Sequence, residues 1–96
     1  MKKDEALELL TRLKPELVAR FGVTHLALFG STVRDEARVD SDIDIVVAFD
    51  GPATSRRYFG VQFLLEDEFD CPIDLVSEKA LRSELRQFIE QEAISV

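Results

Sequence analysis

Apolar residues recur every three or four positions between residues 4 and 21, and this spacing predicts an amphipathic helix. Gly22 follows the last of them and is a residue that commonly ends a helix. Pro15 lies inside the segment, so the pattern predicts either a kink there or a second short helix that begins near the proline.

Short apolar runs further along the chain predict strands at residues 25–29, 42–49 and 72–76. Gly30 ends the first run, and Ser31 is placed to cap a helical turn through residues 32–34. Gly51 and Pro52 break the chain after the second run.

Residues 55–69 predict a second helix, whose apolar stripe consists of Tyr58, Val61, Leu64, Leu65 and Phe69. A closing helix has Ser77 as its expected N-cap and is marked by Leu81, Leu85, Phe88 and Ile89. The last four residues, 93–96, are consistent either with a short edge strand or with a contact to a partner.

The order helix, strand, turn, strand, helix, strand, helix predicts an α+β fold with a small mixed β-sheet packed against helices. At 96 residues with 46% hydrophobic content, the chain has the size of one domain, 1–96, with one core.

The charge balance and the cysteine content narrow the classes of function. A net charge of -7 opposes direct nucleic-acid binding through phosphates. The single cysteine, Cys71, has no internal disulfide partner, and the N-terminal residues lack the apolar core of a signal peptide. No apolar run approaches the length of a membrane span, so we expect a cytoplasmic protein that does not bind membranes.

Aspartates interrupt two of the predicted strands. Asp42 and Asp44 are two residues apart, so they share one face of a strand, whereas Ile43, Ile45 and Val47 fill the opposite, buried face. Asp74 interrupts the third strand and lies beside this pair if the strands share one sheet. Asp40 precedes the strand, and we expect it to face water.

Carboxylates brought together in a partly dry site repel one another unless a cation compensates them. Mg²⁺ favours one or two carboxylates together with water and substrate phosphates, and two such ions can clamp an in-line phosphoryl displacement. Gly30 and Ser31 would supply a phosphate cradle of free N–H groups and a hydroxyl, and Arg34 could contact the same phosphates.

Simpler interpretations exist for each feature alone. Charged residues protect or solvate a strand end, a Gly-Ser pair is often only a turn, and a lone strand aspartate can be bonded to a loop. The combination in this order favours the functional interpretation.

Other known motifs fail at defining positions. An EF-hand needs glycine where Ile45 stands and glutamate where Gly51 stands, and a P-loop needs glycine and lysine where Asp35 and Glu36 stand. One histidine and one cysteine do not make a usual zinc site, and we expect His25 to be structural.

The pattern Phe29-Gly30-Ser31, then Asp42-Ile43-Asp44, then Asp74 resembles the DNA polymerase beta-type nucleotidyltransferase superfamily. The short length and the run LFGSTVRDEARVDSDIDIVVAF resemble more narrowly the minimal nucleotidyltransferases, MNT-type antitoxins that are paired with HEPN-domain toxins. Asp35 stands where that family usually has a glycine after the arginine.

The resemblance implies that Asp42 and Asp44 hold two Mg²⁺ ions, that Asp74 completes one metal site and helps activate the attacking hydroxyl, and that Gly30 and Ser31 bind the phosphates of ATP. It implies a protein adenylyltransferase that transfers AMP to a hydroxyl, such as a tyrosine of a HEPN ribonuclease toxin, in a hetero-oligomer with that toxin. Two alternatives stay open: a non-catalytic antitoxin that neutralises the toxin by occlusion, and a stand-alone nucleotidyltransferase that acts on a small molecule or an RNA end.

Overall fold

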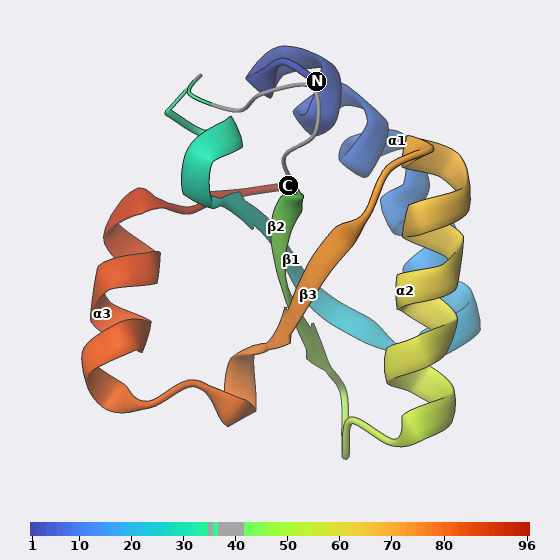
Figure 1. Ribbon diagram of the computed structural model, residues 1–96. Coiled ribbons are helices and arrows are strands. Elements are labelled where there is room, and N and C mark those ends of the chain that lie inside the picture. The colour runs from blue at the N-terminus through green and yellow to red at the C-terminus, as the bar shows by residue number, and fades with distance from the viewer. Residues whose placement is uncertain (35, 37–41) are drawn as a thin grey trace.

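A computed structural model, shown in Figure 1, describes residues 1–34, 36 and 42–96. In chain order the helices, strands and 3₁₀ turns of the described residues are α1 (Lys3–Phe21), β1 (Val23–Phe29), η1 (Gly30–Thr32), β2 (Ile43–Phe49), α2 (Ser55–Phe69), β3 (Ile73–Ser77), η2 (Glu78–Ala80), α3 (Ser83–Glu92) and β4 (Ile94–Ser95). Asp35 and Asp40, which the sequence singled out, lie outside the described residues.

The described strands form one mixed sheet in the order β3-β2-β1-β4. β1 runs antiparallel to both β2 and β4, whereas β2 and β3 run parallel. A parallel pair needs a long crossover connection, and α2 supplies it here. The α+β class and the mixed sheet predicted from the sequence are confirmed, and the C-terminal residues form the edge strand rather than remaining outside the sheet.

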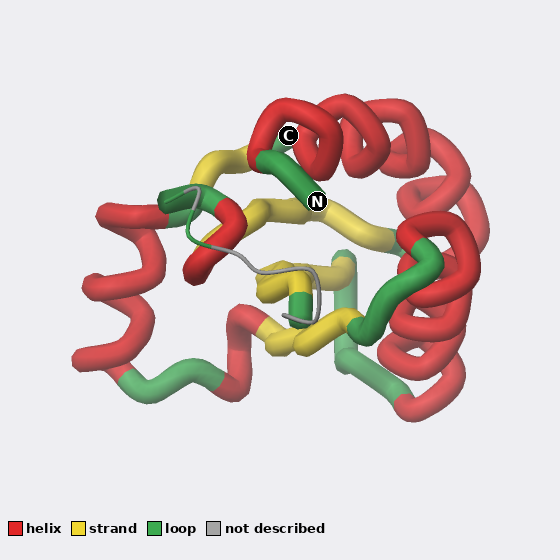
Figure 2. The backbone as a smooth tube through the Cα atoms, turned by 45° about the horizontal axis from the view of Figure 1, so that its top comes forward, coloured by secondary structure: helices red, strands yellow, loops and turns green. Residues whose placement is uncertain are grey.

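Helices lie on both sides of this sheet. Figure 2 shows α1 above and to the right of the strands, α2 to the right and α3 to the left. The face toward α1 and α2 carries the main core, where Ile43, Ile45 and Val47 of β2 are at most 3% exposed. These residues alternate along the strand as the sequence predicted, so Asp44 and Val46 must point to the α3 side.

The first helix is continuous across Pro15, so of the two predicted alternatives the separate second helix is wrong. The helix ends as predicted at Gly22, whose positive φ of 72° suits glycine and whose N–H donates to the carbonyl of Val18. β1 begins at Val23, two residues earlier than the apolar run suggested. None of the described helices is long and apolar enough to cross a membrane.

The closing helix differs most from its prediction. Ser77 precedes the 3₁₀ turn η2 rather than capping α3, and Leu81 and Arg82 are extended, so α3 begins only at Ser83. This interruption removes Leu81 from the helix. Of the marker residues, Ile89 is buried, whereas Leu85 and Phe88 are 53% and 62% exposed.

Candidate active site

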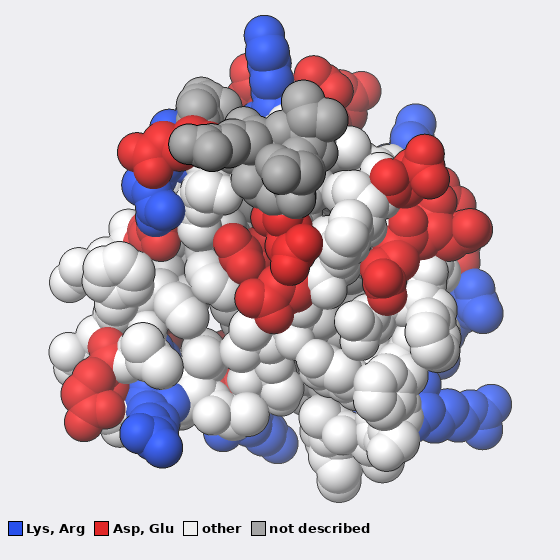
Figure 3. Space-filling model, in the orientation of Figure 1, with Lys and Arg blue, Asp and Glu red and all other residues white. Residues whose placement is uncertain are grey.

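Asp44 and Asp74 occupy paired positions on the parallel strands β2 and β3. Their neighbours Ile43, Ile45 and Ile73 are buried in the main core. Because successive side chains of a strand point to opposite faces, Asp44 and Asp74 point to the face that is opposite this core. Figure 3 shows a compact group of acidic side chains over these strands, with uncharged surface on both sides of it and a second acidic group over α2 on the right. The expectation that Asp74 lies beside the acidic strand is therefore confirmed.

Asp42 immediately precedes β2 and is exposed to solvent. It lies close enough to Asp44 for its negative charge to raise the pKa of that residue. The sequence placed Asp42 inside the strand, but the structure places it at the loop that leads into the strand.

The pKa of Asp44 is raised to about 6, which places its titration near neutral pH. Partial burial is the largest cause, followed by a hydrogen bond with Asp74 and by the negative charges of Asp74 and Asp42. Arg34 opposes these effects, because its positive charge lowers the pKa of Asp44. The site therefore concentrates negative charge that its own cation only partly offsets.

Gly30 brings the turn after β1 directly against Asp44. A Cβ atom at this position would lie 2.1 Å from Oδ2 of Asp44, and the φ of Gly30 is 79°. Both the close contact and the left-handed backbone require glycine. The pairing of Phe29 with Asp44 across β1 and β2 sets this approach.

The turn itself is the 3₁₀ segment η1, which is closed by a hydrogen bond of 3.1 Å from the Val33 N–H to the Gly30 carbonyl. Ser31 lies inside the turn and is partly exposed, so the expectation that it caps a following helix is wrong. The carbonyl of Ser31 accepts a hydrogen bond of 2.9 Å from the Glu36 N–H. Thr32 is 1% exposed, and its hydroxyl lacks a hydrogen-bond partner among the described residues.

Arg34, the expected phosphate contact, forms ion pairs with Glu36 at 3.1 Å and with Glu92 of α3. Hydrogen bonds to Glu36 and to Glu92 raise the pKa of Arg34. A phosphate group would have to compete with these carboxylates for the guanidinium.

The side chains of this site fit Mg²⁺, because Mg²⁺ prefers carboxylate oxygens as its protein ligands. The charges of Asp42 and Asp74 both raise the pKa of Asp44, so the three carboxyl groups lie near one another. The side chains are not preassembled around an ion: within the described part of the chain, no group of three or more His, Cys, Asp or Glu residues is arranged to hold a metal. In this arrangement Asp44 and Asp74 lie side by side at paired positions of β2 and β3.

Tyr58 of α2 makes a contact with β3 that sequence reasoning missed. It was assigned to the apolar stripe of α2, and it is partly buried against the core. Its hydroxyl donates to the carbonyl of Leu75 on β3, and burial followed by the charge of Asp74 raises its pKa.

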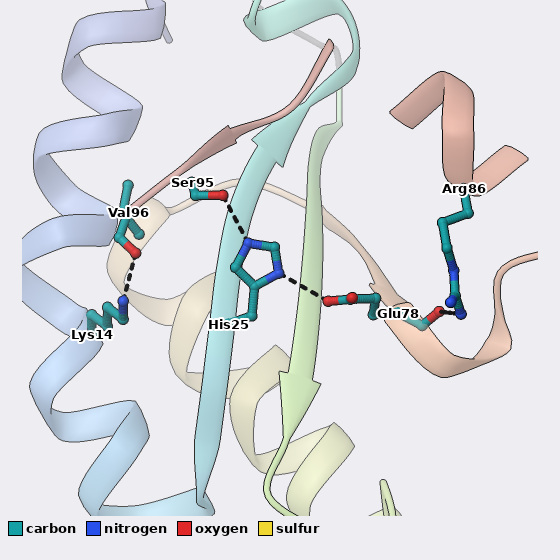
Figure 4. A network of polar contacts seen from close by, with 6 residues as sticks. All are labelled: Lys14, His25, Glu78, Arg86, Ser95 and Val96. Carbon is teal, nitrogen blue, oxygen red and sulfur yellow. Dashed lines mark hydrogen bonds and ion pairs between the residues drawn. The ribbon is translucent and has the colours of Figure 1, made fainter. Parts of the chain in front are cut away.

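A further polar group lies on the face of the sheet that carries Asp44, and sequence reasoning did not predict its partners. His25 of β1 contacts Glu78 Oε2 through Nδ1 at 2.9 Å and Ser95 Oγ through Nε2 at 2.7 Å. Figure 4 shows this network together with Arg86 of α3, which donates to the Glu78 carbonyl, and Lys14, which binds the backbone of Val96. The structural role expected for His25 agrees with these contacts.

Comparison with known proteins gives consistent matches. A family model described as the nucleotidyltransferase domain matches residues 10–96. Protein adenylyltransferase MntA of Thermococcus cleftensis is 36% identical over 93 residues, which cover 97% of this chain and 94% of that protein. A solved structure described as a candidate minimal nucleotidyltransferase is 35% identical, with a TM-score of 0.84, and the match covers 100% of this chain and 97% of that one.

A solved toxin-antitoxin structure with AMP-PNP has a TM-score of 0.70 at 21% identity, over 99% of this chain and 72% of that one. Similarity at this identity shows the fold alone. The family match and the structural similarity confirm the expected fold and the expected enzyme class. The chain belongs to the nucleotidyltransferase domain family.

Proposed function

We propose that this chain transfers AMP from ATP to a hydroxyl group of a partner protein, and that Asp42, Asp44 and Asp74 are its catalytic residues. The observation that carries the proposal is the pairing of Asp44 with Asp74 directly beside the Gly30 turn. The relative from Thermococcus cleftensis, which matches nearly the full length of this chain, is named as a protein adenylyltransferase.

In the proposed site, Asp42 and Asp44 hold two Mg²⁺ ions and Asp74 completes one of the two metal sites. Bound Mg²⁺ would neutralise the charge of the carboxylates and of the substrate phosphates. The raised pKa of Asp44 supports this role, because a carboxylate crowded by like charges gains most from a cation.

The residues of the chain have separate parts in the proposed reaction. Gly30 and Ser31 bind the phosphates of ATP through backbone N–H groups and a hydroxyl, and Arg34 adds its charge. Asp74 accepts the proton of the attacking hydroxyl. A bond forms between that oxygen and the α-phosphorus as the bond to pyrophosphate breaks, so catalysis rests on positioning and charge neutralisation.

The proposed acceptor is a tyrosine of a HEPN-domain ribonuclease toxin, so that the chain acts as the antitoxin in a hetero-oligomer. The toxin-antitoxin structure with AMP-PNP supports this assignment at the level of fold. The resemblance of the motif region to MNT-type antitoxins supports it at the level of sequence.

The test is to incubate the chain with ATP, Mg²⁺ and the HEPN-domain protein of the same genome, and to measure the intact mass of that protein. We expect an added AMP that peptide mapping places on tyrosine and that is lost in Asp42→Asn/Asp44→Asn. Asp67→Asn on the exposed surface of α2 is the matched control and should retain transfer. No added AMP with the unaltered chain would contradict the proposal.

Occlusion of the toxin without catalysis is a second candidate, and the ion pairs of Arg34 with Glu36 and Glu92 favour it because they occupy a proposed phosphate ligand. Rescue of cells from the toxin separates the two. If the Asp42→Asn/Asp44→Asn variant rescues growth as well as the unaltered chain, occlusion is sufficient. Transfer to a small molecule or RNA end without the partner would instead indicate a stand-alone enzyme.

A further inference from the structure

A pocket of about 90 Å³ lies between α3 and the sheet, on the face that carries Asp44 and Asp74. Ala27 of β1 and Val46 of β2 line it from the sheet, and Ile89 of α3 lines it from the helix. Polar side chains of His25, Glu78 and Arg86 share its wall. The pocket therefore combines apolar surfaces with a few polar groups, as small-molecule sites commonly do.

The pocket adjoins the candidate active site along the strands. Ala27 pairs with Val46, and the next pair on the same face is Phe29 with Asp44. One step of two residues along a strand is about 7 Å. The surfaces that Ala27 and Val46 contribute to the pocket are therefore one such step from the carboxylate of Asp44.

The pocket lies along the strands from Asp44, whereas the proposed reaction is aligned across the strands. The Gly30 turn at the end of β1, Asp44 on β2 and Asp74 on β3 follow one another across the sheet. An in-line displacement has its leaving and attacking oxygens on one line, so pyrophosphate near Gly30 and a hydroxyl near Asp74 place that line across the strands. The nucleoside is attached to the same α-phosphorus through a third oxygen. It must therefore point away from the line that joins the attacking and leaving oxygens.

Arg86 provides an independent indication of a ligand. Its Nη2 donates to the Glu78 carbonyl at 3.0 Å, but its buried Nε has no hydrogen-bond partner in the described part of the chain. A buried donor without a partner costs free energy, which an acceptor atom on a bound molecule would recover.

The other groups at the pocket indicate what kind of molecule fits. Glu78 and Glu90 are acidic and disfavour a phosphate, whereas carboxylates accept hydrogen bonds from ring or exocyclic amino groups. The apolar surfaces of Ala27, Val46 and Ile89 suit the face of an aromatic ring. His25 is held between Glu78 and Ser95, so this wall is ordered before any ligand binds.

From these observations we infer that the pocket under α3 binds the purine base of the donor nucleotide, with Arg86 Nε donating to an acceptor atom of the base. This inference rests on the proposed nucleotidyl transfer and adds the subsite that selects the nucleoside. The volume of the pocket accommodates one edge of the base, and the remainder lies across its open side.

The first test compares two ligands that share the phosphates and differ in the nucleoside: ATP and inorganic tripolyphosphate, each with Mg²⁺, measured by calorimetry. Arg86→Gln should weaken ATP binding by about tenfold, as expected for a lost hydrogen bond from a charged donor, and leave tripolyphosphate binding unchanged. Arg82→Gln removes the same charge from an exposed position just before α3 and should change neither affinity.

Arg86→Gln also removes the hydrogen bond from Arg86 to the Glu78 carbonyl, so a second variant tests the pocket without altering Arg86. Ala93 lines the pocket at the end of α3, and Ala93→Leu should fill it and weaken ATP binding without affecting tripolyphosphate. Equal loss for both ligands in Arg86→Gln and Ala93→Leu would overturn the inference, because the effect would then not depend on the nucleoside.

Backbone amide shifts of the unaltered chain give a direct readout. ATP should shift Ala27, Val46 and Ile89 in addition to Ser31, whereas tripolyphosphate should shift Ser31 alone. If ATP shifts only Ser31, or if the HEPN partner rather than ATP shifts the pocket residues, the pocket does not hold the base. Transfer of AMP in the mass assay together with such a result would overturn this inference and leave the proposed function intact.

Discussion

Asp44 and Asp74 occupy paired positions on the parallel strands β2 and β3, and the carboxyl group of Asp74 raises the pKa of Asp44. Burial is the largest cause and the neighbouring Asp74 the next, and together they raise the pKa of Asp44 to about 6, so Asp44 holds a proton at a higher pH than a free aspartate does. The same two groups are the residues we propose for metal binding and proton acceptance. A proton in the metal-free chain and a cation in the working site therefore relieve the same repulsion.

This relationship predicts how the stability of the metal-free chain depends on pH. The pKa of Asp44 rises on folding from 3.8 to about 6, so the folded state holds the proton more tightly. The resulting stabilisation is fully present below pH 3.8 and is lost as the pH rises through 6. We expect Asp44→Asn to be more stable than the unaltered chain at pH 8, and the difference to shrink toward pH 4.

Urea unfolding at a series of pH values in the presence of a chelator measures this effect. Asp67→Asn on the exposed surface of α2 is the control and should follow the unaltered chain at every pH. A pH profile of Asp44→Asn that parallels the unaltered chain would show that Asp44 does not titrate in this range.

Gly30→Ala should damage both stability and activity, because a Cβ there would lie 2.1 Å from Asp44 Oδ2 and the backbone has a φ of 79°. The left-handed backbone alone costs about 1–2 kcal/mol for a residue other than glycine. Gly51→Ala is the matched control, since the nearest atom to its Cβ would be Arg57 Nη1 at an ordinary 3.5 Å. Thermal unfolding and AMP transfer compare the two variants, and equal behaviour would contradict the close approach described here.

Removing the carboxylate of Glu92 should free Arg34 for the phosphates of ATP. We expect Glu92→Gln to lower the KM for ATP by about two- to fivefold, the range for an exposed ion pair. The effect should vanish when Arg34→Ala is also present. Steady-state kinetics measures both, and a lower KM that persists in the double variant would mean that Glu92 acts through another residue.

Gly60→Ala should destabilise the fold although alanine is the better helix former. A Cβ at Gly60 in α2 would lie 2.3 Å from the ring of Phe21 at the end of α1. Combining Gly60→Ala with Phe21→Leu should recover part of the loss. Urea unfolding of the single and double variants tests this contact, and additive losses would show that the two residues do not interact.

The sequence was sufficient to predict the sheet and its acidic pair. Ile43, Ile45 and Val47 alternate with Asp44 in a period that only a half-buried strand explains, and the structure buries them as expected. The position of Asp74 beside Asp44 followed once the strands shared a sheet. These features depend on local periodicity, which a single sequence displays directly.

Features that depend on tertiary contacts were not predictable in the same way. Gly60 lies inside α2, where glycine is a poor helix former, and only the packing of Phe21 explains why a glycine is there. The apolar residues Leu85 and Phe88 indicated an inward face of the closing helix, but only Ile89 of that stripe is buried, because the packing of α3 on the sheet decides which side faces inward. The partners of Arg34 are equally invisible in sequence, because Glu92 is distant along the chain.

The most direct test of the central proposal follows the position of a radioactive label. The chain is incubated with Mg²⁺ and the HEPN-domain protein, in one reaction with ATP labelled at the α-phosphate and in another with ATP labelled at the γ-phosphate. Nucleotidyl transfer by Asp42, Asp44 and Asp74 predicts that the HEPN protein acquires α-label only, and that Asp44→Asn abolishes this labelling. Labelling from the γ-phosphate, or α-labelling that survives Asp44→Asn, would contradict it.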